Sequence, residues 1–218
     1  VVFSQNETRQ SFYSANRDKI EVADLRSDLV MYSLADNTVS VIENKPEYFE
    51  SFPTWTPDGN ALFSVCAKTD FNDHSADEVV RGDKIFNSAT NIFYDLVVRM
   101  FDKEKKTFSK PEIVFSGREH KRSITFPRVS PGGRWLVATV GPYGNFHVWH
   151  KNTDLVIFDF DKKSIRPIVE LNSPDSESYH TFSSKGDWLV FSSRRDDGSF
   201  TRPYFAAFDK ASGKFSKP

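Results

Sequence analysis

The chain has 218 residues, of which 38% are hydrophobic and 27% charged, enough apolar material for one globular domain and too much for a disordered chain. Its 29 Lys and Arg balance 30 Asp and Glu, and a net charge of -1 argues against a nucleic-acid partner. The single cysteine, Cys66, excludes an internal disulfide, a C-x-x-C-H haem attachment and a multi-cysteine zinc site within these residues.

The first predicted element is an apolar strand at Val1 to Ser4. Its sequence aligns with the later segment LVFSSRRDDG (189–198), so the chain is expected to start within a strand. A second pattern, strand, charged turn and strand, then appears four times. Its copies begin at Asp28, Asp95, Asp154 and Tyr204. Aromatic residues make up 15% of the chain, including 21 Phe, and this composition favours strands over helices.

A third pattern alternates with the second one along the chain. It reads SFPTWTPDGNALFSV (51–65), TFPRVSPGGRWLVAT (125–139) and SYHTFSSKGDWLVFS (178–192). Each copy is a short strand, a polar turn with a central glycine and a strongly apolar strand, as expected of a β-hairpin whose turn needs a positive φ. The predicted turns are Pro57 to Asn60, Pro131 to Gly133 and Lys185 to Asp187.

The two hairpin patterns together make a four-stranded unit with strands A to D. Repetition of this unit predicts an all-β protein, a β-propeller with three full blades and a first blade that lacks strand A. The approximate blade segments are 1–48, 49–116, 117–172 and 173–218, as part of a larger propeller. Helices are expected only in connections, such as Ala76 to Arg81. Bulky residues in strand B should be buried between blades, namely Leu62, Phe63, Trp135 and Trp188.

The turn sequences resemble the TolB-like propeller repeat, in which Ser-Pro-Asp-Gly precedes an apolar strand that ends in Phe-Ser. Thr56-Pro57-Asp58-Gly59 and Ser130-Pro131-Gly132-Gly133 are close copies, and Ser183-Ser184-Lys185-Gly186 is a looser one. The longer strings GPYGNFHVWHKNTDL and SYHTFSSKGDWLVFSSRRDDGSFTRPYFAAFD are similar to exported Bacteroidetes propellers, which are WD-repeat-like in architecture. The resemblance implies an exported protein, periplasmic or anchored to an envelope membrane, that works through protein contacts.

The sequence offers no motif for catalysis, a metal or a cofactor. The G-x-S-x-G nucleophile elbow and the H-E-x-x-H zinc motif are both absent. His147 and His150 are three residues apart, and in an extended strand this spacing directs the two imidazoles to opposite faces. Asp196-Asp197-Gly198 is typical of a turn. We therefore predict no catalytic residue, no metal ligand and no cofactor.

Strand order assigns each connection to a face of the propeller. The B-to-C and D-to-A connections share one face, here called the loop face, and the hairpin turns share the opposite one, the turn face. All 5 histidines are expected on the loop face: His74, His120, His147, His150 and His180. The candidate ligand-binding patch consists of Tyr143, His147, His150, His180, Arg194 and Arg195.

Arg194 and Arg195 allow two interpretations. Two adjacent guanidiniums can clamp a carboxylate or phosphate by bidentate hydrogen bonds. Alternatively, they form ordinary pairs with Asp187, Asp196 or Asp197.

The expected function is that of a non-enzymatic binding scaffold of the bacterial cell envelope. Its loop face would recognise a protein or a small ligand, with a protein as the expected partner, no nucleic acid and a peripheral association with the envelope. The alternative is the propeller domain of a larger hydrolase, either a prolyl-oligopeptidase-like peptidase or a glycosidase or lyase, with the catalytic part elsewhere.

Overall fold

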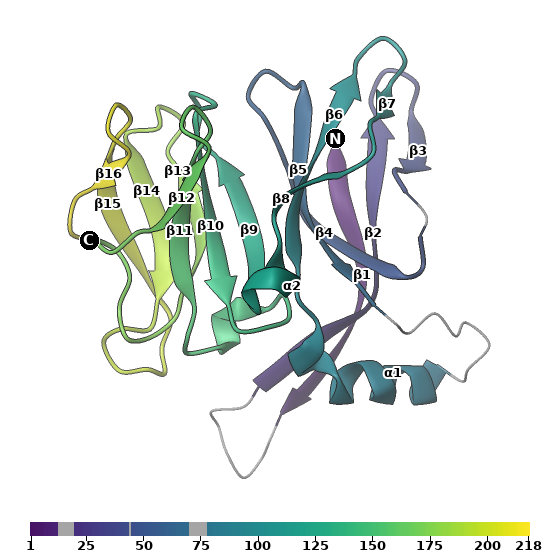
Figure 1. The fold of residues 1–218 in the computed structure, drawn as a ribbon, viewed down its shortest axis with the longest axis horizontal. Coiled ribbons are helices and arrows are strands. Elements are labelled where there is room, and N and C mark those ends of the chain that lie inside the picture. Colours follow the sequence, from purple (N-terminus) through teal and green to yellow (C-terminus); the bar gives the residue numbers. More distant parts are fainter. Residues whose placement is uncertain (13–19, 44, 70–77) are drawn as a thin grey trace.

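The computed structural model describes residues 1–12, 20–43, 45–69 and 78–218. In these parts of the chain, strands form four antiparallel sheets that succeed one another in sequence order. The sheets stand side by side as four blades of a β-propeller, with the first blades at the right and the last at the left of Figure 1. The predicted fold is confirmed.

Blades 3 and 4 hold the four predicted strands, blade 1 holds three, and the sheet of blade 2 has a fifth strand. Blade 1 holds β1 (Val2–Phe12), β2 (Ile20–Ser33) and β3 (Thr38–Val41). Blade 2 holds β4 (Tyr48–Trp55), β5 (Ala61–Lys68), β6 (Asp95–Asp102) and β7 (Thr107–Phe108), with β8 (Glu112–Phe115) also paired to β6. Blade 3 holds β9 (Ser123–Val129), β10 (Trp135–Gly141), β11 (Asp154–Asp159) and β12 (Ser164–Pro167). Blade 4 holds β13 (Glu177–Phe182), β14 (Trp188–Ser193), β15 (Arg202–Asp209) and β16 (Lys214–Phe215).

The predicted hairpin turns lie where the glycines indicated. Gly59, Gly133 and Gly186 have φ angles of 67°, 78° and 71°, a region that side chains with a Cβ avoid. Each glycine N–H closes the turn on the carbonyl oxygen three residues earlier, at 2.9 Å for Gly59 and 2.8 Å for the other two. These turns connect β4 to β5, β9 to β10 and β13 to β14, so the motif marks the start of strand B in three blades.

Strand A of blades 2, 3 and 4 (β4, β9 and β13) also contains a β-bulge, which the sequence pattern does not predict. It occurs at an aromatic residue with positive φ, 52° at Phe52, 50° at Phe126 and 46° at Tyr179. The rings of neighbouring blades touch, with centroids 4.2 Å apart for Phe52 and Phe126 and 4.5 Å apart for Phe126 and Tyr179. Because a bulge adds one residue, it reverses the side-chain alternation downstream.

The apolar core lies between the blades. Leu62 and Phe63 are buried, as predicted, and so is Trp135, whose indole N–H donates to the Lys210 carbonyl oxygen of blade 4 at 2.8 Å. The prediction for Trp188 is wrong, because this side chain is 52% exposed. It occupies the same motif position as Trp135, but it faces away from blade 3, and no described segment covers that side of blade 4.

Helices are confined to connections, as expected. The main one, α1 (Glu78–Asn87), lies between β5 and β6, slightly later than the predicted 76–81. Short helical turns occur at η1 (Ala89–Asn91), α2 (Gly117–His120) and η2 (His147–Trp149). No helix in the described ranges is long and apolar enough to span a membrane.

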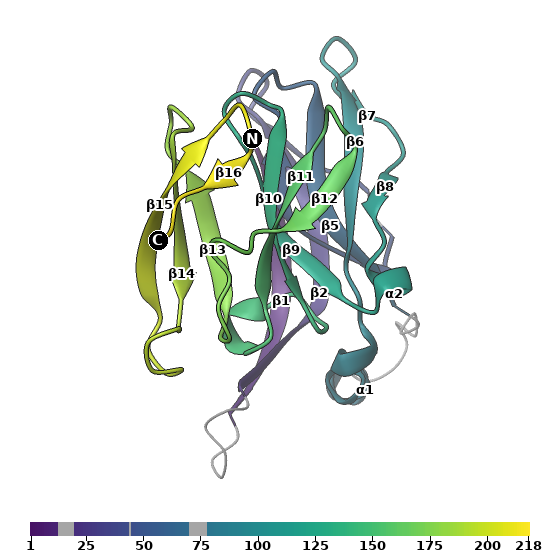
Figure 2. The ribbon, with the colours of Figure 1, turned by 60° about the vertical axis from the view of Figure 1, so that its left-hand side comes forward.

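Blade 1 has an unusually long hairpin. β1 and β2 pair from Val2 with Met31 to Phe12 with Ile20, so their far ends extend past the other blades on the loop face (Figure 1 and Figure 2). α1 lies against this extension, where Arg9 forms an ion pair with Asp83 at 2.5 Å. The extension reaches residues of blade 3.

Candidate functional site

The connection between β10 and β11 (142–153) carries three of the predicted patch residues, and two of them meet one carboxylate. The Tyr143 hydroxyl donates to Glu21 Oε2 at 2.9 Å, and His150 Nε2 lies 3.6 Å from Glu21 Oε1. The Tyr143 and His150 rings are in contact, with centroids 4.5 Å apart and planes tilted by 49°. Glu21 belongs to the extended hairpin of blade 1, and the sequence analysis did not single it out.

A buried carboxylate, Asp24, lies three residues further along the same strand, β2. Its Oδ2 accepts hydrogen bonds from Asn6 at 3.0 Å, Asn145 at 2.5 Å and Ser51 at 3.3 Å. These donors come from blades 1, 3 and 2, so one carboxylate joins three blades on the loop face. Asp24 is 2% exposed, and burial raises the pKa of its carboxyl.

His147 packs in the interior of the protein instead of facing a ligand. Its side chain is fully buried, and its Nδ1 is hydrogen-bonded to Thr125 Oγ1 of β9 at 2.9 Å. Gly141 lies against the ring so closely that a Cβ there would come within 2.6 Å of the imidazole. Burial lowers the pKa of His147 to about 3, so the ring stays neutral at physiological pH.

His180 lies apart from the loops, in a position that differs from the expected one. The bulge at Tyr179 turns the His180 side chain into the interface with blade 3, where its Nε2 donates to the Val137 carbonyl oxygen at 2.9 Å. Burial lowers the pKa of this imidazole to about 4. Of the other histidines, His120 stacks on Phe115 at the end of α2, and His74 lies outside the described residues.

The two buried histidines make stability sensitive to mild acid. Both have a pKa below the value of about 6.5 that an unfolded chain provides, so below that pH the unfolded chain binds more protons. The contribution of these two histidines to stability is therefore complete well above pH 6.5 and decreases as pH falls, by about 1 kcal/mol per histidine between pH 6.5 and pH 5.5. Denaturant unfolding at both pH values should show this loss.

Two substitutions test that assignment. His180→Gln keeps a donor for Val137 but cannot titrate, so about half of the loss between pH 6.5 and 5.5 should disappear. His120→Gln removes an exposed imidazole in the same way and is the matched control. An identical profile for His180→Gln and the wild type would contradict the assignment.

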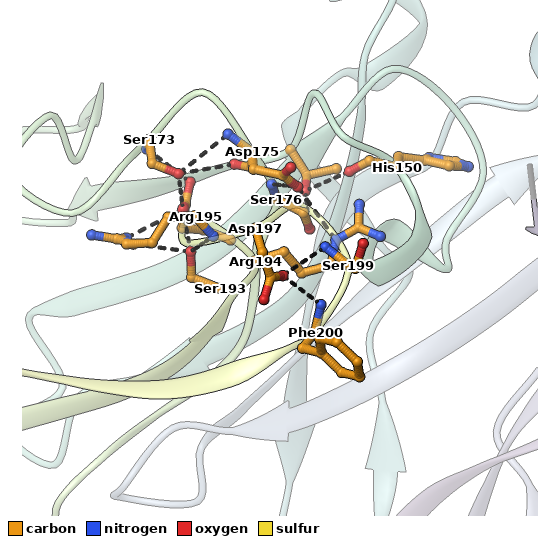
Figure 3. Close-up of polar contacts among 12 residues, drawn as sticks. His150, Ser173, Asp175, Ser176, Ser193, Arg194, Arg195, Asp197, Ser199 and Phe200 are labelled. Carbon is orange, nitrogen blue, oxygen red and sulfur yellow. Dashed lines mark hydrogen bonds and ion pairs between the residues drawn. The ribbon is translucent and has the colours of Figure 1, made fainter. Parts of the chain in front are cut away.

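Arg195 is held by blade 4 and by the connection that leads into it. Its Nη2 donates to the Leu171 carbonyl oxygen at 2.5 Å and lies 3.2 Å from Glu177 Oε1. Its Nε donates to Ser193 Oγ at 3.0 Å (Figure 3). The guanidinium also lies over the Tyr204 ring, 4.6 Å from its centroid. These contacts leave little of Arg195 for a ligand.

Arg194 is less well satisfied. Its Nε lies 3.3 Å from Asp175 Oδ1, and its buried Nη2 has no hydrogen-bond partner in the described chain. The two arginines therefore form ion pairs, as the second interpretation predicts, but their partners are Asp175 and Glu177 instead of the predicted aspartates. Asp187 pairs instead with Lys210, and Asp197 with Arg202.

Three loops join into one rim on the loop face. Thr153 Oγ1 and Ser176 Oγ are hydrogen-bonded at 2.7 Å, and Ser176 Oγ lies 3.4 Å from the His147 carbonyl oxygen. The Ser176 carbonyl oxygen in turn accepts from the Arg194 N–H at 3.3 Å. We call the connections 142–153, 168–176 and 194–201 the rim. The rim carries Tyr143, His150, Arg194 and Arg195, and the buried His147 belongs to its first connection.

The rim lacks the arrangement of a metal site. Across the residues that the structure describes, no three His, Cys, Asp or Glu side chains converge as ligands of one ion. Its carboxylates are instead close to arginines, Asp175 to Arg194 and Glu177 to Arg195. Such a surface is suited to charged and aromatic contacts.

Comparison with protein-family models and with curated protein sequences gives no match. Solved structures do match. TolB from Acinetobacter baumannii is 15% identical with a TM-score of 0.51, over 88% of this chain and 37% of TolB. An oligogalacturonate lyase in complex with manganese is 11% identical with a TM-score of 0.57, over 92% of this chain and 50% of the lyase. A puromycin-hydrolysing peptidase of Mycobacterium tuberculosis is 12% identical with a TM-score of 0.53, over 98% of this chain and 31% of the peptidase.

These similarities establish the fold, a TolB-like β-propeller. The chain spans half or less of the length of each of the three structures. Enzymes occur among them, and identities of this size leave open whether this chain has any catalytic role.

Proposed function

We propose that the chain is a non-catalytic binding propeller of the bacterial cell envelope and that its loop face recognises a protein partner. The envelope location is supported by the similarity to TolB and by the resemblance of the repeat to exported propellers. The rim supplies the recognition surface, on loops that the blades hold in place.

The observation that carries this proposal is an exposed aromatic residue on a pre-organised loop. Phe200, in the connection between β14 and β15, is 69% exposed. The carboxylate of Asp197 accepts the N–H groups of Ser199 and Phe200, both at 2.9 Å, and an Arg202 hydrogen bond at 2.7 Å (Figure 3 shows the first two). Because the loop is fixed before binding, little conformational entropy is lost on contact.

The chemistry of the loop also suits a protein interface. Exposed aromatic and arginine side chains in one place are the residues that most often dominate binding energy between proteins. Arg202 lies 5.8 Å from the centroid of the Phe200 ring, so the two groups can act together. The nearby carboxylates serve as partners of arginines, and the Arg202 hydrogen bond lowers the pKa of Asp197.

Site-specific photo-crosslinking in cells that make the protein tests the proposal. A crosslinker in place of Ser199, on the loop face, should give a discrete protein adduct, whereas one in place of Lys185, on the turn face, should not. Equal adducts from both positions, or none from position 199, would contradict recognition by the loop face.

The adduct should depend on the aromatic ring. Phe200→Ser should weaken capture of the partner about tenfold, the effect of 1.4 kcal/mol. Phe205→Ser is a matched control, because Phe205 is 61% exposed but lies on strand β15, outside the loop. Equal losses in the two variants would show that exposed apolar surface in general, rather than this loop, captures the partner.

A further inference from the structure

A second region with the properties of a binding site lies between blades 2 and 3, away from Phe200. A cavity of about 330 Å³ opens between their outer strands. Its apolar lining includes Phe115 at the end of β8, Val156 of β11 and Ile165 of β12. Ile165 is 42% exposed, so the apolar wall reaches the surface.

The charged lining is dominated by Arg122, which follows α2. Its Nη2 reaches only the Val140 and Asn152 carbonyl oxygens, both at 3.4 Å, and stays 3.8 Å from Asp154 Oδ2. Typical hydrogen bonds of this kind are about 0.5 Å shorter. Its Nε is buried without a partner among the described residues. The Arg122 guanidinium is therefore poorly satisfied by the protein itself.

The other charged groups around the cavity do not supply the hydrogen bonds that Arg122 lacks. Arg166 donates to the Gly213 carbonyl oxygen at 2.7 Å and to Glu170 Oε2 at 3.3 Å, so its guanidinium already has partners, one of them a carboxylate. His120 is hydrogen-bonded through Nδ1 to the Ser116 carbonyl oxygen. Among the described residues Asp154 is the one carboxylate that lines the cavity, and it stays 3.8 Å from Arg122.

We propose that this cavity binds a small organic carboxylate with an apolar body. Arg122 holds the carboxylate, since a guanidinium binds planar oxyanions through two hydrogen bonds. Phe115, Val156 and Ile165 cover the hydrocarbon part. At about 30 Å³ per water-sized group, the volume corresponds to roughly ten such groups, the size of a short-chain or aromatic acid. This site is independent of the protein-binding role proposed for the rim.

Calorimetric titration with hexanoate tests the proposal, and hexanamide serves as the uncharged probe of the same shape. Hexanoate should bind with a Kd of about 1 mM or lower, and hexanamide at least about tenfold more weakly. Arg122→Gln should weaken hexanoate binding about tenfold or more. Arg202→Gln should leave it unchanged, which is a matched control because the Arg122 and Arg202 side chains are 40% and 42% exposed.

A second variant separates binding from folding. Ile165→Trp keeps Arg122 but fills the cavity, so it should abolish hexanoate binding while the thermal unfolding midpoint stays near that of the wild type. Three results would overturn the proposal: no binding of hexanoate to the wild type at 10 mM or so, equal binding of hexanamide, or equal losses in Arg122→Gln and Arg202→Gln.

Discussion

Trp135→Ala should lower the free energy of unfolding by about 3–5 kcal/mol, the range measured for large aromatic side chains removed from protein cores. Trp135 is 5% exposed and fills the space between blades 3 and 4. Its ring lies beneath Gly213, where even one added methyl group would come within 2.4 Å of it, and Arg134 lies 4.5 Å from its centroid. Truncation therefore leaves a cavity and removes the hydrogen bond to Lys210.

Trp188→Ala is the matched control. It removes the same side chain from the same position of the repeat, but this ring is 52% exposed, so the loss should stay below about 1 kcal/mol. Chemical denaturation of both variants measures the difference. Equal losses would show that an additional covering surface buries Trp188 in solution.

Arg99→Ala should also destabilise the protein by about 3–5 kcal/mol, because it leaves a buried charge without its partner. Arg99 in β6 is 1% exposed. Its guanidinium contacts the Glu50 carboxylate of β4, Glu43 Oε2 at 3.0 Å and Ser64 Oγ at 3.1 Å. Removal of the Arg99 side chain leaves the buried Glu50 carboxylate without this positively charged partner.

The loss of unfolding free energy in Arg99→Ala should increase with pH. Burial already raises the pKa of Glu50, and without the opposing charge of Arg99 it rises further. A carboxyl with a raised pKa in the folded state binds a proton more readily there than in the unfolded chain. Stability is therefore lost as pH rises, and Arg99→Ala should be closer to the wild type at pH 5 than at pH 8.

A double substitution shows whether the cost comes from the stranded charge. Glu50→Leu with Arg99→Met replaces the pair by apolar groups of similar volume and should recover most of the wild-type stability. Urea unfolding at pH 5 and pH 8 measures all three proteins. A double variant as unstable as Arg99→Ala, or a pH-independent deficit, would contradict this account.

The sequence by itself determined the blades. A glycine turn followed by an apolar strand is a local signal, since a positive φ and the strand periodicity depend on residues that are neighbours in the chain. Gly59, Gly133 and Gly186 therefore marked three hairpins correctly. The burial of Trp135 and the exposure of Trp188 do not follow from the motif, because within the described residues a following blade covers the first tryptophan and none covers the second.

The polar contacts of the loop face were decided by the tertiary structure. Tyr143 meets Glu21 across 122 positions and Asn145 meets Asp24 across 121, through a hairpin whose length no local pattern reveals. Arg194 and Arg195 lie next to Asp196 and Asp197 in sequence, yet they pair with Asp175 and Glu177. The bulge at Tyr179 moved His180 from the expected rim into the interior. Hairpins close through neighbouring residues, whereas these pairs exist only after the blades have packed and set the distances between their loops.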